Sequence, residues 1–142
     1  MQATPLEGAP HRRTWMLVFR GGDQIEPELV RFAEQNSIQA AEIRGIGGFR
    51  EVTLAYFEKK TMQYEPIPVK EQVEVVSILG NLTRFEGKPK LHAHVLIGKK
   101  DGSNLAGHLL AATVWPTLEL FLTAYNEPLE RKKDPETKLP LL

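Results

Sequence analysis

The chain has 142 residues, and its 18 basic and 18 acidic side chains leave no formal net charge. This length suits one domain with a core of its own, because a chain of this size buries about two-thirds of its unfolded surface. The charge balance argues against a protein that mainly grips nucleic-acid phosphates, although it leaves room for a local basic face. The sequence contains no cysteine, which excludes disulfides, thiolate metal sites, iron–sulfur clusters and cysteine nucleophiles.

Hydropathy gives no sign of a secretory or membrane segment. Residues 1–15 (MQATPLEGAPHRRTW) lack the uninterrupted apolar segment of a signal peptide, and no apolar run approaches the length that crosses a bilayer. We therefore expect a cytoplasmic protein with no membrane partner.

The first predicted elements are a strand and a helix. Residues 14–20 (TWMLVFR) form a short apolar run rich in aromatic and branched side chains, which favours a strand. Residues 25–36 (IEPELVRFAEQN) follow, with four apolar positions at helical spacing: Ile25, Leu29, Phe32 and Ala33. Pro27 and the acidic residues beside it suit a first helical turn, so this segment is predicted to be a helix.

The stretch AEIRGIGGFREVTLAYF is interpreted as two strands that meet at a turn in the glycines of residues 45–48, since glycine tolerates the positive φ of tight bends. A GxGG pattern also occurs in phosphate loops, but a dinucleotide site requires a following helix, and FREVTLAYF alternates like a strand. Arg44 and Arg50 flank the glycines. They could bind an anion, but we favour a solvated surface role.

The rest of the chain continues in short strands. Pro66 and Pro68 confine their segment to a sheet edge or a connection, whereas VEVVSIL (73–79) has the composition of an interior strand. Turn sequences then separate KLHAHVLIG from NLAGHLLAATVW, and LELFLTAY follows Trp115-Pro116 as the last strand. Strands in hairpin order with one or two flanking helices indicate a single α+β domain built on antiparallel sheet.

Three of the four histidines lie in the segment KLHAHVLIGKKDGSNLAGHLLA. Side chains alternate along a strand, so His92 and His94 share one face. The opposite face is wholly apolar and is predicted to face the core: Leu91, Ala93, Val95 and Ile97. The two imidazoles are therefore either the polar outer side of a half-buried strand or ligands of a metal ion.

Whether His108 joins the pair depends on the register of the hairpin. All three rings share a face if His108 lies opposite His94, with loop 98–104, or opposite His92, with loop 98–102. The intermediate register turns His108 to the other face. The return strand is apolar on both sides, so its hydrophobic pattern does not choose between the registers.

Three neutral imidazoles with an open coordination position describe a catalytic type of zinc site, which other divalent first-row metals would also accept. Water bound to such a metal can have a pKa near 7 and act as nucleophile or base. A carboxylate that orients a ligand or carries a proton is expected nearby. Four residues are candidates, and their spacing does not rank them: Glu42, Glu71, Glu74 and Glu119.

Other chemistries find less support in the sequence. There is no GxSxG nucleophile motif, Walker lysine or EF-hand loop. Ser103 lies in a polar turn, where a hydroxyl normally helps the backbone to bend. His11 is distant from the other histidines and is expected to be a surface residue.

Three segments, EIRGIGGFREVTLAYF, EQVEVVSILGNLT and KPKLHAHVLIGKKDGSNLAGHLLAATVWPTLELFLTAY, resemble the prokaryotic PPC domain (plant and prokaryote conserved domain), often labelled a DNA-binding protein with a PD1-like motif. The resemblance runs from Thr14 to Tyr125. We assign residues 14–126 to this domain and residues 1–13 to an N-terminal extension. Residues 127–142 form a charged, proline-broken tail that we expect to be loosely ordered or laid on a partner.

The resemblance implies an α+β homotrimer in which an HxH pair and a later GH histidine bind zinc, which here would be His92, His94 and His108. Plant members bind AT-rich DNA through a separate Arg-Gly-Arg-Pro core, which this chain lacks. The preferred hypothesis is a cytoplasmic homotrimer that binds zinc and binds or acts on a small molecule; its substrate and any enzymatic activity are left open. The alternatives are a DNA-binding or regulatory protein without an AT-hook and a purely structural oligomerisation module.

Overall fold

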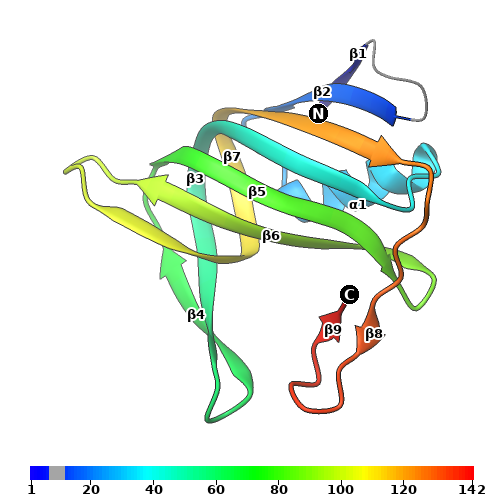
Figure 1. The fold of residues 1–142 in the computed structure, drawn as a ribbon. Helices are drawn as coiled ribbons and strands as arrows, with labels where there is room; N and C mark the ends of the chain where they lie inside the picture. The colour runs from blue at the N-terminus through cyan, green and yellow to red at the C-terminus, as the bar shows by residue number, and fades with distance from the viewer. Residues whose placement is uncertain (7–11) are drawn as a thin grey trace.

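The computed structural model describes residues 1–6 and 12–142, so His11 lies outside the described residues. That part of the chain forms one helix and nine strands, whose arrangement can be followed in Figure 1. In chain order they are β1 (Gln2–Leu6), β2 (Arg12–Arg20), α1 (Ile25–Gln35), β3 (Ala41–Glu58), β4 (Gln63–Val69), β5 (Val73–Phe85), β6 (Lys88–Gly98), β7 (Asn104–Tyr125), β8 (Lys132–Lys133) and β9 (Pro140–Leu141). The α+β class expected from the sequence is confirmed.

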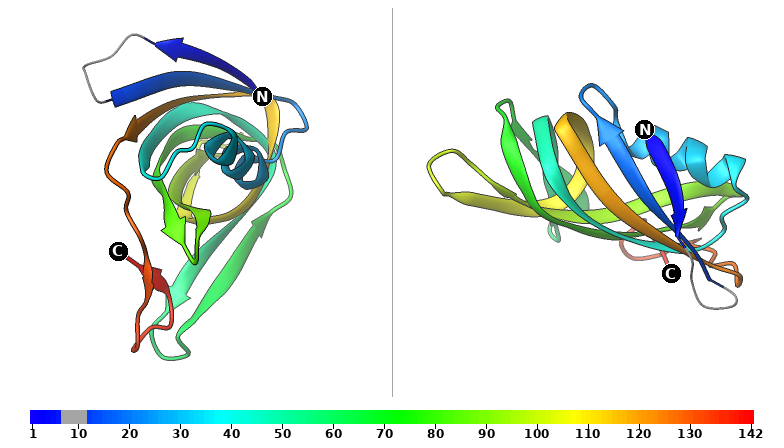
Figure 2. Two further views of the ribbon diagram at one scale, coloured as in Figure 1. Left: turned by 90° about the vertical axis from the view of Figure 1, so that its right-hand side faces the viewer. Right: turned by 90° about the horizontal axis from the view of Figure 1, so that it is seen from above.

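Seven strands form one antiparallel sheet in the order β1-β2-β7-β6-β5-β3-β4, and β7 also pairs with β3. Strands β3, β5, β6 and β7 therefore close into a ring of pairings. Figure 2 shows how this curved sheet surrounds α1. Strand β4 lies at one edge of the sheet and β5 in its interior, as the prolines of the first and the composition of the second predict.

The core lies between α1 and the concave face of the sheet. The helix buries the four side chains that its sequence spacing predicts, Ile25, Leu29, Phe32 and Ala33. Phe32 packs edge-to-face against Trp15 of β2, with ring centroids 5.5 Å apart. Each large apolar side chain buried in this way contributes about 1.5–3 kcal/mol, which fixes the helix inside the sheet. No helix in the described residues has the length and apolar composition needed to span a membrane.

The glycines of residues 45–48 differ from the expected turn, because they lie inside the single continuous strand β3. The pairing with β5 shifts register between Gly45 and Gly47, which marks a bulge and not a chain reversal. A Cβ atom added at Gly47, where φ is 153°, would lie 2.4 Å from the carbonyl oxygen of Thr117. The glycines are needed because the backbone of β7 passes very close to β3.

Strand β7 also differs from the prediction of two strands separated at Trp115-Pro116. It is one element, and the peptide bond between these two residues is cis. The register of its pairing with β3 shifts between Val114 and Leu118, the stretch that contains Pro116. Proline has no N–H to donate to the ladder, so it interrupts the pairing without ending the strand. The first part of β7 can thus pair with β6 and its last part with β2.

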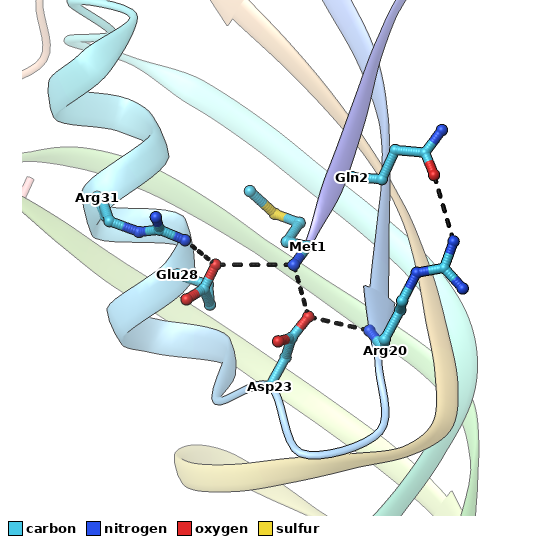
Figure 3. A network of polar contacts seen from close by, with 6 residues as sticks. All are labelled: Met1, Gln2, Arg20, Asp23, Glu28 and Arg31. Atoms are coloured by element: carbon cyan, nitrogen blue, oxygen red, sulfur yellow. Dashed lines mark hydrogen bonds and ion pairs between the residues drawn. The ribbon is translucent and has the colours of Figure 1, made fainter.

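A polar network ties β1 to the beginning of α1 (Figure 3). The amino group of Met1 lies 2.8 Å from Oδ2 of Asp23 and 3.9 Å from Oε2 of Glu28. Asp23 also accepts a hydrogen bond from the backbone N–H of Arg20 at 2.9 Å, and Glu28 pairs with Arg31 on the next helical turn. The two carboxylates therefore hold the first strand beside the loop that leads into the helix.

Residues 127–142, expected to be loosely ordered or laid on a partner, make contacts with the end of β5 and with one another. The backbone N–H of Arg84 donates to Leu129, and that of Arg131 donates back to Arg84, at 2.8 and 2.7 Å. Strands β8 and β9 then pair as a short hairpin. Arg131 in this tail is only 6% exposed, which the charged composition of the segment does not indicate.

Candidate metal centre

The hairpin of β6 and β7 sets the register that brings the histidines together. His94 lies opposite His108, which is one of the registers that places all three rings on one face. The turn supports this register: the N–H of Lys99 donates to the carbonyl of Ser103, and Asp101 accepts bonds from the backbone and hydroxyl of Ser103. The geometry of the turn therefore favours this register of the hairpin, which the apolar sequence of β7 does not specify.

The three imidazoles form an almost equilateral triangle. Ring centroids are 5.3 Å apart for His92 and His94, 5.2 Å for His92 and His108, and 5.5 Å for His94 and His108. One nitrogen of each ring lies within 4.8 Å of the other two. Nitrogens bound to one zinc ion lie about 3.3 Å apart, so the separations have to close by at most roughly 1.5 Å, which side-chain torsions can supply.

The face opposite the histidines is buried as predicted. Leu91, Ala93, Val95 and Ile97 are all at most 6% exposed, while His92 and His108 are half-buried and His94 is exposed. The apolar row anchors β6 against the core, so the position of the histidine row does not depend on flexible loops.

Electrostatics keep two of the rings neutral. Burial, and then the positive charge of Arg131, lower the pKa of His92. Burial and the two neighbouring histidines lower the pKa of His108 from 6.5 to about 4. A metal binds only the deprotonated imidazole, so these shifts keep both rings ready to coordinate at neutral pH.

The chemistry of this donor set fits a divalent metal. Nδ1 of His108 is buried and has no hydrogen-bond partner within the described part of the chain, which is a costly state for a polar nitrogen. A cation among the three rings would give such a nitrogen a partner. Of the groups of titratable side chains in the described residues, this is the one whose ligand atoms converge closely enough to hold an ion.

Tyr64 was not predicted as a site residue, yet it covers one of the rings. It lies on edge strand β4, which pairs with β3 and brings the phenol over β7. Its ring stacks on His108 with centroids 4.5 Å apart and planes inclined by 23°. Burial raises the pKa of Tyr64, so its hydroxyl stays protonated and can donate a hydrogen bond.

Arg131 is the second residue that sequence analysis missed. Its Nε donates to the hydroxyl of Thr83 at 2.7 Å, and its two terminal nitrogens donate to the carbonyl of Pro140 at 2.8 Å and to Oδ1 of Asn81 at 2.6 Å. Asn81 lies opposite His92 in the pairing of β5 and β6, so the guanidinium is held beside the histidine row.

A cavity of about 250 Å³ adjoins the histidines. Its walls come from β4, β6, β7 and the C-terminal tail: Tyr64, Lys90, Leu91, His92, His108, Leu110, Arg131, Leu139, Pro140 and Leu141. In Figure 1 the hairpin of β3 and β4 and the tail strands β8 and β9 extend toward the same side of the molecule. The cavity lies where these extensions meet the sheet.

The four candidate carboxylates do not join the histidines. None of them belongs to the converging group or lines the cavity. Glu71 instead pairs with Lys99 at 2.7 Å, Glu74 and Glu119 line a separate surface cavity, and Glu42 is exposed.

The arginines beside the glycines are exposed, in keeping with a surface role. Arg44 lies over the ring of Phe121 and Arg50 over that of Trp115, at 5.5 and 5.7 Å from the ring centroids. Stacking on an aromatic face accounts for the positions of both guanidinium groups.

Comparison with known proteins identifies the family. The model of the Plants and Prokaryotes Conserved (PCC) domain matches residues 7–126. This range includes the predicted domain at 14–126, whose own boundaries stay a prediction. No curated protein matches the chain.

Solved structures from several microorganisms share this fold over nearly the whole chain. A plant- and prokaryote-conserved (PPC) protein of Pyrococcus horikoshii is 28% identical, with a TM-score of 0.86 over 99% of this chain and 93% of its own. A metal-containing protein of Archaeoglobus fulgidus is 30% identical, with a TM-score of 0.85 over 99% and 97%. A protein of Bacteroides thetaiotaomicron, provisionally named a DNA-binding protein, is 28% identical, with a TM-score of 0.86 over 98% and 95%. Because the family model covers most of the chain and the fold agrees, the protein belongs to the Plants and Prokaryotes Conserved domain family.

Proposed function

We propose that the protein binds one divalent metal ion, with zinc as the first candidate, through His92, His94 and His108. The observation that carries this proposal is the convergence of one ring nitrogen from each of the three histidines. The buried Nδ1 of His108, which has no hydrogen-bond partner in the described residues, supports it. The relative from Archaeoglobus fulgidus is itself a metal-containing protein, which supports the proposal. Zinc held by three imidazoles keeps an open position, where it can polarise a carbonyl or lower the pKa of a bound water.

We further propose that a small molecule binds in the cavity beside the histidines. Tyr64 and the leucines of β6, β7 and the tail would shield it from water, while the phenol and Arg131 supply donors to orient it. The cavity volume of about 250 Å³ is below the range of drug-sized ligand sites, which begins at about 300 Å³. A small metabolite is therefore the expected ligand.

Metal analysis of protein purified without an affinity tag tests the metal proposal. His94→Ala is the most informative variant, because this side chain is exposed and its loss should leave the core intact. The variant should lose the metal and keep its secondary structure by circular dichroism. His11→Ala, which changes the remaining histidine of the chain, is the matched control and should keep the metal. Undiminished metal in His94→Ala would refute the assignment.

The proposed assembly is a homotrimer, in line with the family resemblance. An apolar patch of the outer sheet surface supports association with other copies: Ile46, Val76, Leu79 and Phe121 are 60%, 50%, 60% and 37% exposed. Sedimentation analysis should give three times the 16.0 kDa mass of the chain. Leu79→Glu should shift the protein to smaller species, and a wild-type mass of one chain would contradict the proposal.

DNA binding is a second candidate function, favoured by the relative from Bacteroides thetaiotaomicron that is provisionally named for it. The neutral charge of the chain supports it poorly, because phosphate binding is driven by basic side chains. A gel-shift titration at low salt separates the two functions: retardation that weakens steeply with salt would favour DNA binding. The cytoplasmic location stays a prediction, which fractionation of the source cells would test.

A further inference from the structure

Arg131 is held in place by the backbone as well as by its side chain. The chain before β8 pairs with the end of β5 through Arg84, and the guanidinium then reaches Thr83 and Asn81 on β5. The guanidinium also donates a hydrogen bond to the carbonyl of Pro140 on β9. The short tail hairpin therefore places a cation in the wall of the histidine cavity.

The charge of Arg131 is not balanced by a carboxylate. All three of its hydrogen-bond acceptors are neutral oxygens, and no ion pair among the described residues includes it. The side chain is only 6% exposed, and burial lowers its pKa. A buried charge without a counterion is expensive, and proteins normally pair such groups.

The guanidinium also keeps unused donors. It carries five N–H groups, and the three hydrogen bonds engage one N–H on each nitrogen. One N–H on each terminal nitrogen is thus left for a ligand, and the two oxygens of a carboxylate can accept such charge-assisted hydrogen bonds.

The other residues that line the cavity also favour a ligand with a carboxylate group. Lys90 adds a second cation, but it is half-exposed and lies 3.5 Å from Glu26, so its charge is partly balanced. No acidic side chain lines the cavity in the part of the chain that is described. The remaining surface is mostly apolar, from Leu110, Leu139 and Leu141. One unbalanced positive charge with two free donors suits a monoanion with an apolar body better than a phosphate, which carries up to two charges and three acceptor oxygens.

We propose that Arg131 is the carboxylate-binding residue of a subsite for a small organic acid in the cavity that His92 and His108 also line. The inference rests on the proposed function in that the ligand and the metal would share this cavity. The tail hairpin is then part of the binding site, and the bound carboxylate supplies the counterion that the protein itself does not provide.

An NMR titration of the metal-loaded, ¹⁵N-labelled protein with isobutyrate tests the subsite. Isobutyrate should shift the amide signals of cavity residues, whereas isobutyramide, its neutral counterpart, should bind at least about tenfold more weakly. Arg131→Met should weaken isobutyrate binding by at least about tenfold, and Arg131→Lys should retain part of it because the charge remains. Lys132→Met removes an exposed neighbouring charge that does not line the cavity, so it should leave the affinity unchanged.

Loss of the tail fold in Arg131→Met would mimic loss of the subsite, so Lys90→Met serves as a second variant. It leaves the hydrogen bonds of Arg131 intact and should weaken isobutyrate binding by a smaller factor, about threefold. Equal binding of isobutyrate and isobutyramide, or unchanged affinity in both Arg131→Met and Lys90→Met, would overturn the proposal. Tighter binding of inorganic phosphate than of isobutyrate would overturn the choice of a carboxylate.

Metal content measured in the same samples separates this proposal from the proposed function. If the wild-type protein retains metal but binds neither isobutyrate nor phosphate, the subsite fails and the metal site stands. If the protein holds no metal, yet isobutyrate binds and Arg131→Met abolishes that binding, the metal site fails and the subsite stands.

Discussion

Acidification should destabilise the metal-free protein through His108. The folded state resists protonation of this ring, because burial and the two neighbouring histidines lower its pKa to about 4. In the unfolded chain the ring titrates near its ordinary pKa of 6.5. Between these two values the unfolded state binds more protons than the folded state, so the free energy of unfolding falls as the pH is lowered through this window.

The size of this effect follows from the two pKa values. At about 1.4 kcal/mol for each pKa unit, the full difference corresponds to an upper limit of about 3 kcal/mol. The ring is half-buried, and water screens part of the interaction. We therefore expect His108 to lower the free energy of unfolding by about 1–2 kcal/mol between about pH 7 and about pH 4.5.

Urea unfolding of chelator-treated wild type and His108→Gln, followed by tryptophan fluorescence, measures this contribution. Carboxylates titrate in the same pH range in both proteins, so only the difference between them reports on His108. On acidification, the free energy of unfolding of His108→Gln should rise by about 1–2 kcal/mol relative to that of the wild type. If the difference between the two proteins is the same at both pH values, the reasoning about this buried ring is wrong.

Two further predictions concern the metal and the bulged strand. Zinc at about 100 times its dissociation constant should stabilise the wild-type protein by about 2.7 kcal/mol in the same unfolding assay. Zinc should leave the free energy of unfolding of His108→Gln nearly unchanged. Equal stabilisation of the variant and the wild type would argue against His108 as a ligand. Gly47→Ala should lower the free energy of unfolding by more than about 2 kcal/mol, because its Cβ would lie 2.4 Å from the carbonyl oxygen of Thr117. Gly98→Ala, whose nearest neighbour would be 3.5 Å away, is the control, and an equal loss there would contradict the steric explanation.

The fold class and the helix are predictable because they depend on periodic burial. The helical spacing from Ile25 to Ala33 and the alternation of Ala93 and Val95 with the histidines are local patterns, and both match the buried residues. The glycines of β3 are a different case. Glycine permits both a tight turn and the close approach of another backbone, and only the position of Thr117 on β7 shows which of these is needed.

The candidate site is predictable only in part. His92 and His94 share a face by strand geometry alone, whereas the position of His108 depends on a register that an apolar strand does not specify. Tyr64 and Arg131 carry no local signal, because an edge strand and a charged tail bring them to the cavity from distant parts of the sequence. Arg131 is buried although it lies in a segment whose composition indicates disorder.

The most direct measurement is anomalous X-ray diffraction at the zinc absorption edge, on crystals of untagged protein grown with zinc. We predict one anomalous peak for each chain, bounded by the imidazoles of His92, His94 and His108. A peak at any other position, or His108 turned away from the other two rings, would contradict the proposed metal site.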